Sequence, residues 1–244
     1  MSRTKRSKRS SGYNFFQSVF FLLVFLTAAY VLTRSSIFEV REIRVLGNTT
    51  LSRENIISVA GINPGENIFR LDLKAAAEKL KVVSVIKTAE LNRRLPSAVE
   101  IRVAERVACA LVPVETGFIQ VDDEGVYIQK GDVGISQLPV VTGLKFDLPS
   151  PGGKIKSERL DIALAVIRGV PPGLPARLSE IFIEGDQAVV YTLDGIQCRF
   201  GAPVDLKQKG EVFMKIVEGI KTKAKRIEYI DLSHAASPVV KYIE

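Results

Sequence analysis

The sequence predicts an α+β protein: a single N-terminal transmembrane helix, a β-α-α-β-β domain, and then a mostly antiparallel β domain with two helices. Three observations lead to this assignment. Residues 15–32 form an uncharged apolar run, FFQSVFFLLVFLTAAYVL. The next segment of the chain has strand-like and helix-like periodicity in the order β-α-α-β-β. The second half consists mainly of short alternating runs separated by turn residues.

The uncharged run is predicted to be a transmembrane helix over residues 15–33. The 18 residues of the run, as a helix, would span about 27 Å, close to the ~30 Å hydrocarbon core of a bilayer. Five basic residues precede it, and no acidic residue occurs before Glu39. Because Lys and Arg stay on the cytoplasmic side, we expect a single-pass membrane protein. Its tail, residues 1–14, would be cytoplasmic, and everything after Arg34 would be outside.

Two other interpretations of this run are weaker. A cleaved signal peptide also has a basic start, but its apolar region is usually shorter and ends in a small-x-small cleavage site. Here Ala28-Ala29 is followed by Tyr30 and Val31, which are poor cleavage neighbours. A buried helix of a soluble core is disfavoured by the basic flank together with hydrophobicity on all sides.

The formal charge of +7 does not indicate nucleic-acid binding. Six of the 34 basic residues lie in residues 1–34, which leaves 28 basic against 27 acidic residues in the rest. A near-neutral body offers little to a phosphate backbone, whereas a basic tail suits anionic lipid head groups. The two cysteines, Cys109 and Cys198, match no metal-binding spacing. We expect them to be small buried strand residues rather than a disulfide.

The first extracytoplasmic domain begins with a half-buried strand that contains Val40, Ile43 and Val45. Two helices follow. Ser52 is a plausible N-cap for the first, which runs to Ala60 with Gly61 at its C-terminal end, and Asp72 caps the second. Strands are expected over residues 83–91 and 98–104. These last two strands join by a short connection, which excludes a parallel doubly wound sheet.

The second domain is predicted to be mostly strands separated by turns at residues 123–125, 185–186 and 194–195. Helices are expected over residues 158–168 and from Asp205 onward. Two closing strands, residues 227–232 and 238–243, lead to the end of the sequence. The carboxylates of residues 122–124 are expected to belong to a solvated hairpin turn.

No catalytic constellation is evident in the sequence. The only histidine is His234, and Ser233 beside it would point to the opposite face of a strand. A serine nucleophile needs a base within hydrogen-bond range and a third group to orient that base. The sequence also lacks a phosphate-binding glycine loop and a His/Cys/Asp metal spacing. We therefore expect neither an enzyme nor a cofactor.

Several segments resemble the FtsQ/DivIB family of bacterial cell-division proteins. IRVLGN, GENIFRLD and AELNRRLPSAVEIRVAERVACA look like a POTRA (polypeptide-transport-associated) domain just after a membrane helix. FIQVDDEGVYI with LPVVTG resembles the start of that family's β-rich domain, and RIEYIDLSHAASPVVKY resembles its end. The resemblance runs through essentially the whole chain in order. It implies a POTRA domain over residues 34–106 and an FtsQ-type β domain over residues 107–244.

The resemblance also implies a scaffold of the divisome at the division septum. The POTRA domain would serve recruitment, and the β domain would dock the FtsB–FtsL pair and influence septal peptidoglycan synthesis, with other divisome members as further partners. In the family the last strand is the docking edge. Its partner-binding positions align here with His234, Ala236, Ser237, Val239, Val240 and Tyr242. The residues alone are also consistent with an ordinary closing strand whose Val and Tyr side chains fill the core.

The main alternative function is that of a POTRA-bearing assembly factor in another envelope transport or outer-membrane biogenesis machine. Such a protein normally carries several POTRA repeats or a transmembrane β-barrel. The sequence indicates one unit and no barrel-length series of strands. A membrane-anchored cell-wall enzyme is disfavoured because no catalytic site is evident.

Overall fold

The N-terminal helix is the longest element of the protein. The computed structural model describes residues 11–221 and 227–243, so the predicted basic tail lies largely outside the described residues. Helix α1 spans Ser11–Thr33. Within the described residues it is the one helix long and apolar enough to cross a membrane, over Phe15–Thr33, and none of that span is buried in the protein. Ser35 then caps a short 3-10 helix, η1, at Ser36–Phe38.

The chain divides into two compact units. Unit 1 comprises Met1–Leu80 and Ala89–Val103, and unit 2 comprises Lys81–Thr88 and Ala104–Glu244. The division falls within the two long strands of the first sheet, so neither unit is one continuous segment of chain. Each unit has its own buried apolar residues.

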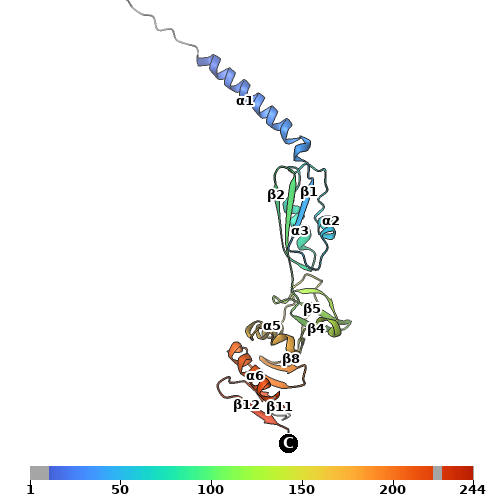
Figure 1. Ribbon diagram of the computed structural model, residues 1–244, viewed down its shortest axis with the longest axis vertical. Coiled ribbons are helices and arrows are strands. Elements are labelled where there is room, and N and C mark those ends of the chain that lie inside the picture. Colours follow the sequence, from blue (N-terminus) through green and yellow to red (C-terminus); the bar gives the residue numbers. More distant parts are fainter. Residues whose placement is uncertain (1–10, 222–226, 244) are drawn as a thin grey trace, which may run out of the picture. The chain divides into compact units, whose positions relative to one another are not determined.

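The first sheet has three strands in the order β1-β3-β2, with β1 parallel to β3. Its elements are β1 (Glu42–Leu46), α2 (Arg53–Ala60), α3 (Leu73–Lys81), β2 (Ile86–Arg94) and β3 (Ala98–Glu105). This β-α-α-β-β order confirms the predicted one, and Figure 1 shows both helices beside the sheet. The predicted caps are present too. Ser52 accepts the N–H of Asn55 at 3.2 Å, and Asp72 accepts that of Ala75 at 2.9 Å.

The interior of unit 1 is formed by one side of each helix and the facing residues of the sheet. Ile56 and Leu80 are buried on α2 and α3, and Ile101 is buried on β3. Gly61 ends α2 in the left-handed conformation at φ 67°, which a residue with a Cβ rarely adopts. The second sheet-facing residue of β1, Val45, is only half-buried because it lies near the end of its strand.

Within the part of the chain that the structure describes, the second sheet has nine strands in the order β12-β11-β10-β9-β8-β7-β4-β5-β6. Its elements are β4 (Ala110–Val114), β5 (Gly117–Val121), β6 (Tyr127–Gly131), α4 (Val133–Ser136), β7 (Val140–Thr142), α5 (Glu158–Gly169), η2 (Pro175–Arg177), β8 (Leu178–Glu184), β9 (Gln187–Thr192), β10 (Gln197–Gly201), α6 (Leu206–Lys221), β11 (Ile227–Asp231) and β12 (Val239–Tyr242). Figure 1 shows α5 and α6 beside strands of this sheet. Antiparallel pairs predominate, as predicted.

Three neighbouring pairs in this sheet are parallel: β4–β7, β7–β8 and β10–β11. Parallel neighbours cannot be joined by a tight hairpin and need a crossover. Helix α5 lies in the connection from β7 to β8, and α6 lies in the connection from β10 to β11. The two predicted helices of this domain are therefore the crossovers that make its sheet mixed.

The cysteines are free thiols in unit 2. Cys198 is buried on β10, as expected, whereas Cys109 is half-buried and lies just before β4. Burial raises the pKa of the Cys109 thiol to about 12, and burial raises that of Cys198 as well. Since the thiolate is the reactive form, neither cysteine has the character of a nucleophile.

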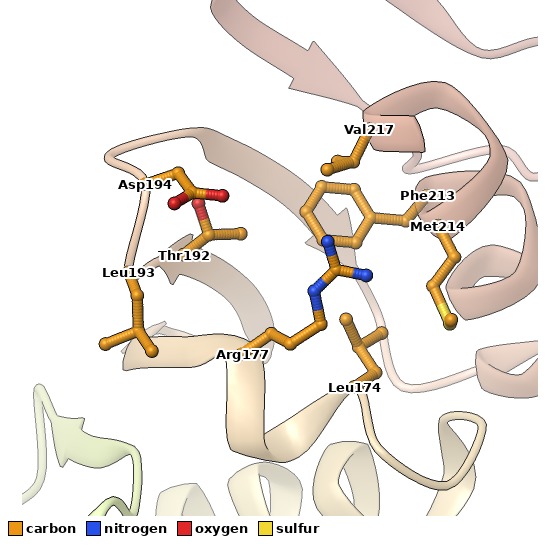
Figure 2. Close-up of a pocket in the computed structure, with 8 residues that line it drawn as sticks. All are labelled: Leu174, Arg177, Thr192, Leu193, Asp194, Phe213, Met214 and Val217. Atoms are coloured by element: carbon orange, nitrogen blue, oxygen red, sulfur yellow. The ribbon is translucent and has the colours of Figure 1, made fainter. Parts of the chain in front are cut away.

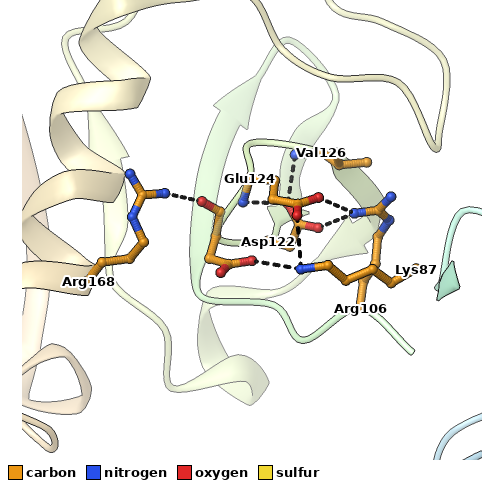
Figure 3. Close-up of polar contacts among 7 residues, drawn as sticks. Lys87, Arg106, Asp122, Glu124, Val126 and Arg168 are labelled. Carbon is orange, nitrogen blue, oxygen red and sulfur yellow. Dashed lines mark hydrogen bonds and ion pairs between the residues drawn. The ribbon is translucent and has the colours of Figure 1, made fainter. Parts of the chain in front are cut away.

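The prediction of a solvated carboxylate turn at residues 122–124 is wrong for Asp122, which is only 1% exposed. Its carboxylate accepts hydrogen bonds from the backbone N–H groups of Glu124 and Val126 at 3.0 and 2.9 Å, and it pairs with Arg106 (Figure 3). The chain turns inward between β5 and β6 at this residue, and Arg106 supplies the opposite charge. The Asp123 and Glu124 side chains are exposed, as predicted, and pair with Lys87 at 3.6 and 3.1 Å.

Candidate partner-binding edge

Strand β12 is an edge strand of the nine-stranded sheet. Among the described residues, β11 is its only neighbour in the sheet. The two strands are antiparallel, with Asp231 opposite Val239 and Ile230 opposite Val240. The backbone on the other side of β12 thus faces away from the sheet. An edge of this kind can accept an extended partner segment by backbone hydrogen bonding.

The turn before β12 is held by hydrogen bonds of its own residues. The Ser233 N–H donates to Asp231 Oδ1 at 2.9 Å, and the Ser237 N–H donates to the His234 carbonyl at 3.1 Å. Partial burial by itself raises the pKa of Asp231, but the bonds from Ser233 and the nearby Arg199 hold that pKa below its ordinary value. Pro238 directly precedes the strand, where its missing N–H interrupts no ladder bond.

The six predicted partner-binding residues divide between this turn and the strand. His234, Ala236 and Ser237 are exposed in the turn, and the other three lie on β12. Val239 is 55% exposed and Tyr242 is 43% exposed. Val240 is half-buried and packs against the core of unit 2. The strand therefore uses one predicted residue for packing and leaves two with large exposed side chains.

A row of charged and aromatic side chains crosses the three strands next to this edge. The Arg199 guanidinium of β10 lies 5.0 Å from the centroid of the Tyr229 ring on β11, and Lys241 Nζ of β12 lies 5.8 Å from it. Lys241 also pairs with Glu228 at 2.9 Å, and that hydrogen-bonded partner raises the pKa of the lysine. A cation over an aromatic face is attracted by the ring quadrupole.

A buried lysine of α6, Lys209, holds the end of β10, the third strand from this edge. Lys209 is 1% exposed, and its Nζ donates to the carbonyls of Phe200 and Ala202 at 2.6 and 2.9 Å. Burial lowers the pKa of Lys209. Between those carbonyls Gly201 is in the left-handed region at φ 65°, and a Cβ there would lie 3.2 Å from Ser233. The end of β10 is thus fixed close to the turn that precedes β12.

A separate cavity of about 210 Å³ lies in unit 2. Its lining residues are Leu174, Arg177, Thr192, Leu193, Asp194, Phe213, Met214 and Val217. Figure 2 shows the Arg177 side chain extending toward the Phe213 ring.

No group of three or more His, Cys, Asp or Glu side chains within residues 11–221 and 227–243 could hold a metal ion.

Comparison with known proteins supports the family resemblance. The family model described as "POTRA domain, FtsQ-type" matches residues 38–106. "Cell division protein FtsQ" of Anaeromyxobacter sp. (strain K) is 29% identical over 210 residues, which cover 84% of this chain and 71% of that protein. "Cell division protein DivIB" of Clostridium botulinum (strain Hall) is 24% identical over 213 residues, 85% of this chain and 82% of that protein.

The chain belongs to the FtsQ/DivIB family. It is thus a cell-division protein of a non-enzymatic family with an FtsQ-type POTRA domain, which confirms the expectation that it is not an enzyme. A solved extracytoplasmic domain of DivIB from Geobacillus stearothermophilus is 18% identical to this chain, with a TM-score of 0.36. The match covers 50% of this chain and 99% of the solved domain. That similarity is too low to support an inference.

Sequence reasoning missed the row formed by Arg199, Tyr229 and Lys241 in this FtsQ/DivIB chain. Alternation within residues 197–201 does place the Arg199 side chain on the opposite face of the strand from those of Cys198 and Phe200, which are buried. The register between β10 and β11, however, depends on a parallel pairing across the α6 crossover. No turn fixes that register in the sequence, so the row becomes visible only in the structure.

Proposed function

We propose that this chain is a membrane-anchored scaffold of the divisome that docks the FtsB–FtsL complex and links early division proteins to septal peptidoglycan synthesis. It would be a single-pass protein of the inner membrane at the division septum, with its N-terminus in the cytoplasm and its other domains outside. The inferred parts are the tail (1–14), the transmembrane helix (15–33), the POTRA domain (34–106) and the β domain (107–244). A fluorescent fusion concentrated at midcell would support this function, whereas a uniform envelope signal would contradict it.

The edge position of β12 is the observation that carries the docking proposal. A partner strand added beside β12 would extend the sheet through backbone hydrogen bonds, and exposed side chains would supply specificity. Val239 and Tyr242 offer apolar and aromatic surface at the edge. Tyrosine is enriched among residues that dominate binding energies. The row of Arg199, Tyr229 and Lys241 adds positive charge beside this surface, which suits a partner segment that carries acidic residues.

Two substitutions test docking at this edge. Val240→Pro removes a backbone donor from β12, and Tyr242→Ala removes the aromatic side chain but leaves the strand backbone intact. We expect both to weaken binding of purified FtsB, and Tyr242→Ala to cost about 2 kcal/mol or more, roughly 30-fold in Kd. Binding would be measured with the full chain, and circular dichroism would verify that each variant is folded.

The matched control is Gln129→Pro in β6, which places a proline in the edge strand at the other end of the sheet order. This variant is expected to bind FtsB like the unaltered protein. Unchanged binding by folded Val240→Pro and Tyr242→Ala variants would place the docking site elsewhere.

The proposed membrane anchoring is tested by Val24→Lys. A lysine at the centre of a transmembrane helix costs about 2.5–3.5 kcal/mol on the insertion scale, so we expect membrane-inserted protein to fall sharply. A reporter that is active only outside the membrane should work when fused after Glu244 and fail when fused before Phe15. Val24→Leu is the control and should insert normally. Release of a soluble product cut near Ala29 would contradict the uncleaved anchor.

A further inference from the structure

Three separate segments of unit 1 meet at the end of helix α1. The first segment, residues 34–41, follows the helix directly. The other two, residues 66–71 and 93–97, are joined to it and to each other by hydrogen bonds. Asn67 Nδ2 donates to the carbonyl of Thr33, the last residue of α1, at 2.7 Å. The Ile68 N–H donates to the Phe38 carbonyl at 2.8 Å. This end of the unit is therefore fixed to the point where the apolar helix ends.

The third segment joins the other two through its own hydrogen bonds. The Arg41 N–H donates to the Ser97 carbonyl at 2.8 Å. Arg93 Nε donates to the Ile68 carbonyl at 2.7 Å. The turn between β2 and β3 consequently lies beside the chain that leaves α1.

Each of these segments exposes one large apolar side chain. Ile37 is 50% exposed, Phe69 is 43% exposed and Leu95 is 60% exposed. The Phe69 ring lies 5.0 Å from that of Phe38, which supports it from one side. A single exposed apolar residue is ordinary. Three of them on three segments joined at one end of a unit indicate an interaction surface, which we call the juxtamembrane patch (Ile37, Phe69 and Leu95).

The patch lies within reach of the bilayer interface. Ile37 is four residues beyond Thr33, which is at most about 14 Å of extended chain. The polar interfacial layer on each side of the hydrocarbon core is roughly 5–8 Å thick. At the end of α1 the Arg34 guanidinium lies 4.7 Å from the centroid of the Tyr30 ring, and aromatic and basic residues of this kind favour the interface.

The charges around the patch are mixed, which makes apolar burial the main driving force. The charged residues of the three segments are Arg34, Arg41, Arg70, Arg93 and Arg94 on the basic side and Glu39 and Glu66 on the acidic side. Arg94 is paired with Glu100 at 3.1 Å. The Arg41 and Arg93 guanidinium groups donate to backbone carbonyls of the same segments. Those of Arg34 and Arg70 suit lipid phosphates, but they would act together with the apolar side chains and not in place of them.

We propose that the juxtamembrane patch inserts into the headgroup–acyl boundary of the outer leaflet of the bilayer that α1 spans. The occupant of this surface is thus the lipid itself, on an interface continuous with the anchor. Insertion would restrict how unit 1 tilts on the membrane. This inference rests on the proposed membrane anchoring by α1, and its test separates the two.

The absence of tryptophan from the sequence allows single-tryptophan reporters. The full chain would be placed in liposomes of phosphatidylglycerol and phosphatidylethanolamine, with or without phospholipids brominated near the headgroup end of their acyl chains. Phe69→Trp keeps an aromatic ring against Phe38, and Leu95→Trp changes an exposed turn. We expect both to lose emission with brominated lipid and to be shielded from aqueous acrylamide.

Two further reporters serve as controls. Val24→Trp lies at the middle of α1, where a second lipid, brominated near the ends of its acyl chains, reports whether the helix is in the bilayer. Leu46→Trp is the matched control, because Leu46 is 46% exposed on the same unit but lies at the other end of β1, roughly 16 Å along the strand from Arg41. It should be quenched by acrylamide and not by brominated lipid.

Each pattern of quenching decides between the proposals. If brominated lipid quenches Val24→Trp but neither Phe69→Trp nor Leu95→Trp, the patch inference is overturned and the anchoring stands. If it quenches none of them, both fail. Shielding of the patch reporters from lipid and acrylamide alike would indicate a second copy of the chain as the occupant, which also overturns the inference. Thermal unfolding of each variant would verify that the reporters retain the fold.

Discussion

Asp122→Ala is expected to lower the free energy of unfolding of unit 2 by about 3–5 kcal/mol, the usual range when one partner of a buried ion pair is removed. The Asp122 carboxylate is 1% exposed and satisfies two backbone N–H groups as well as Arg106 (Figure 3). The Arg106 side chain is only 15% exposed, so water cannot fully replace its partner. Urea denaturation followed by circular dichroism would measure the loss.

The neighbouring Asp123→Ala is the control for this prediction. Its side chain is 53% exposed and lies 3.6 Å from Lys87. Exposed ion pairs contribute about 0–1 kcal/mol, so this variant should unfold almost like the unaltered protein. Equal losses for the two variants would show that burial of Asp122 does not matter. Asp122→Asn should fall between them, since it keeps the size of the side chain and loses its charge.

Leu80→Ala is expected to destabilise unit 1 by about 2–5 kcal/mol, because it opens a cavity in a packed interior. Leu80 is fully buried on α3. Val82, two residues later, is 81% exposed, and Val82→Ala should change stability by less than about 0.5 kcal/mol. Urea denaturation of both variants gives the comparison. A loss below about 1 kcal/mol for Leu80→Ala would contradict the assigned core.

The parts of the fold that depend on local chemistry could be predicted from the sequence. The caps at Ser52, Gly61 and Asp72 were each indicated by residue type and position, and all three are present. The same holds for the uncharged run that became α1 and for the turn-separated strands β8, β9 and β10. In each case the determining residues are neighbours in the chain.

The parts that depend on distant pairing could not be predicted. The parallel pairs of the second sheet join strands separated by a crossover, so periodicity within each strand says nothing of its neighbour. Asp122 looked like one carboxylate of a solvated turn because its partner, Arg106, is 16 residues away. Strand β2 begins at Ile86, not at residue 83, and continues through Arg94. The second half of β2, which ends in Arg93 and Arg94, is mostly exposed, as is typical of an edge strand. Its residues do not alternate between buried and exposed.

The short strand β7 gives the nine-stranded sheet a mechanical weak line. It meets β4 at a single register pair, Leu111 opposite Val140, with one further bond from the Leu111 N–H to the Pro139 carbonyl at 2.9 Å. The antiparallel neighbours β8 and β9 are instead paired along most of their length. A partner that pulls on β12 while the envelope constricts would load these strands in series. The sheet would then part at the β4–β7 boundary and leave β7–β12 joined as one piece.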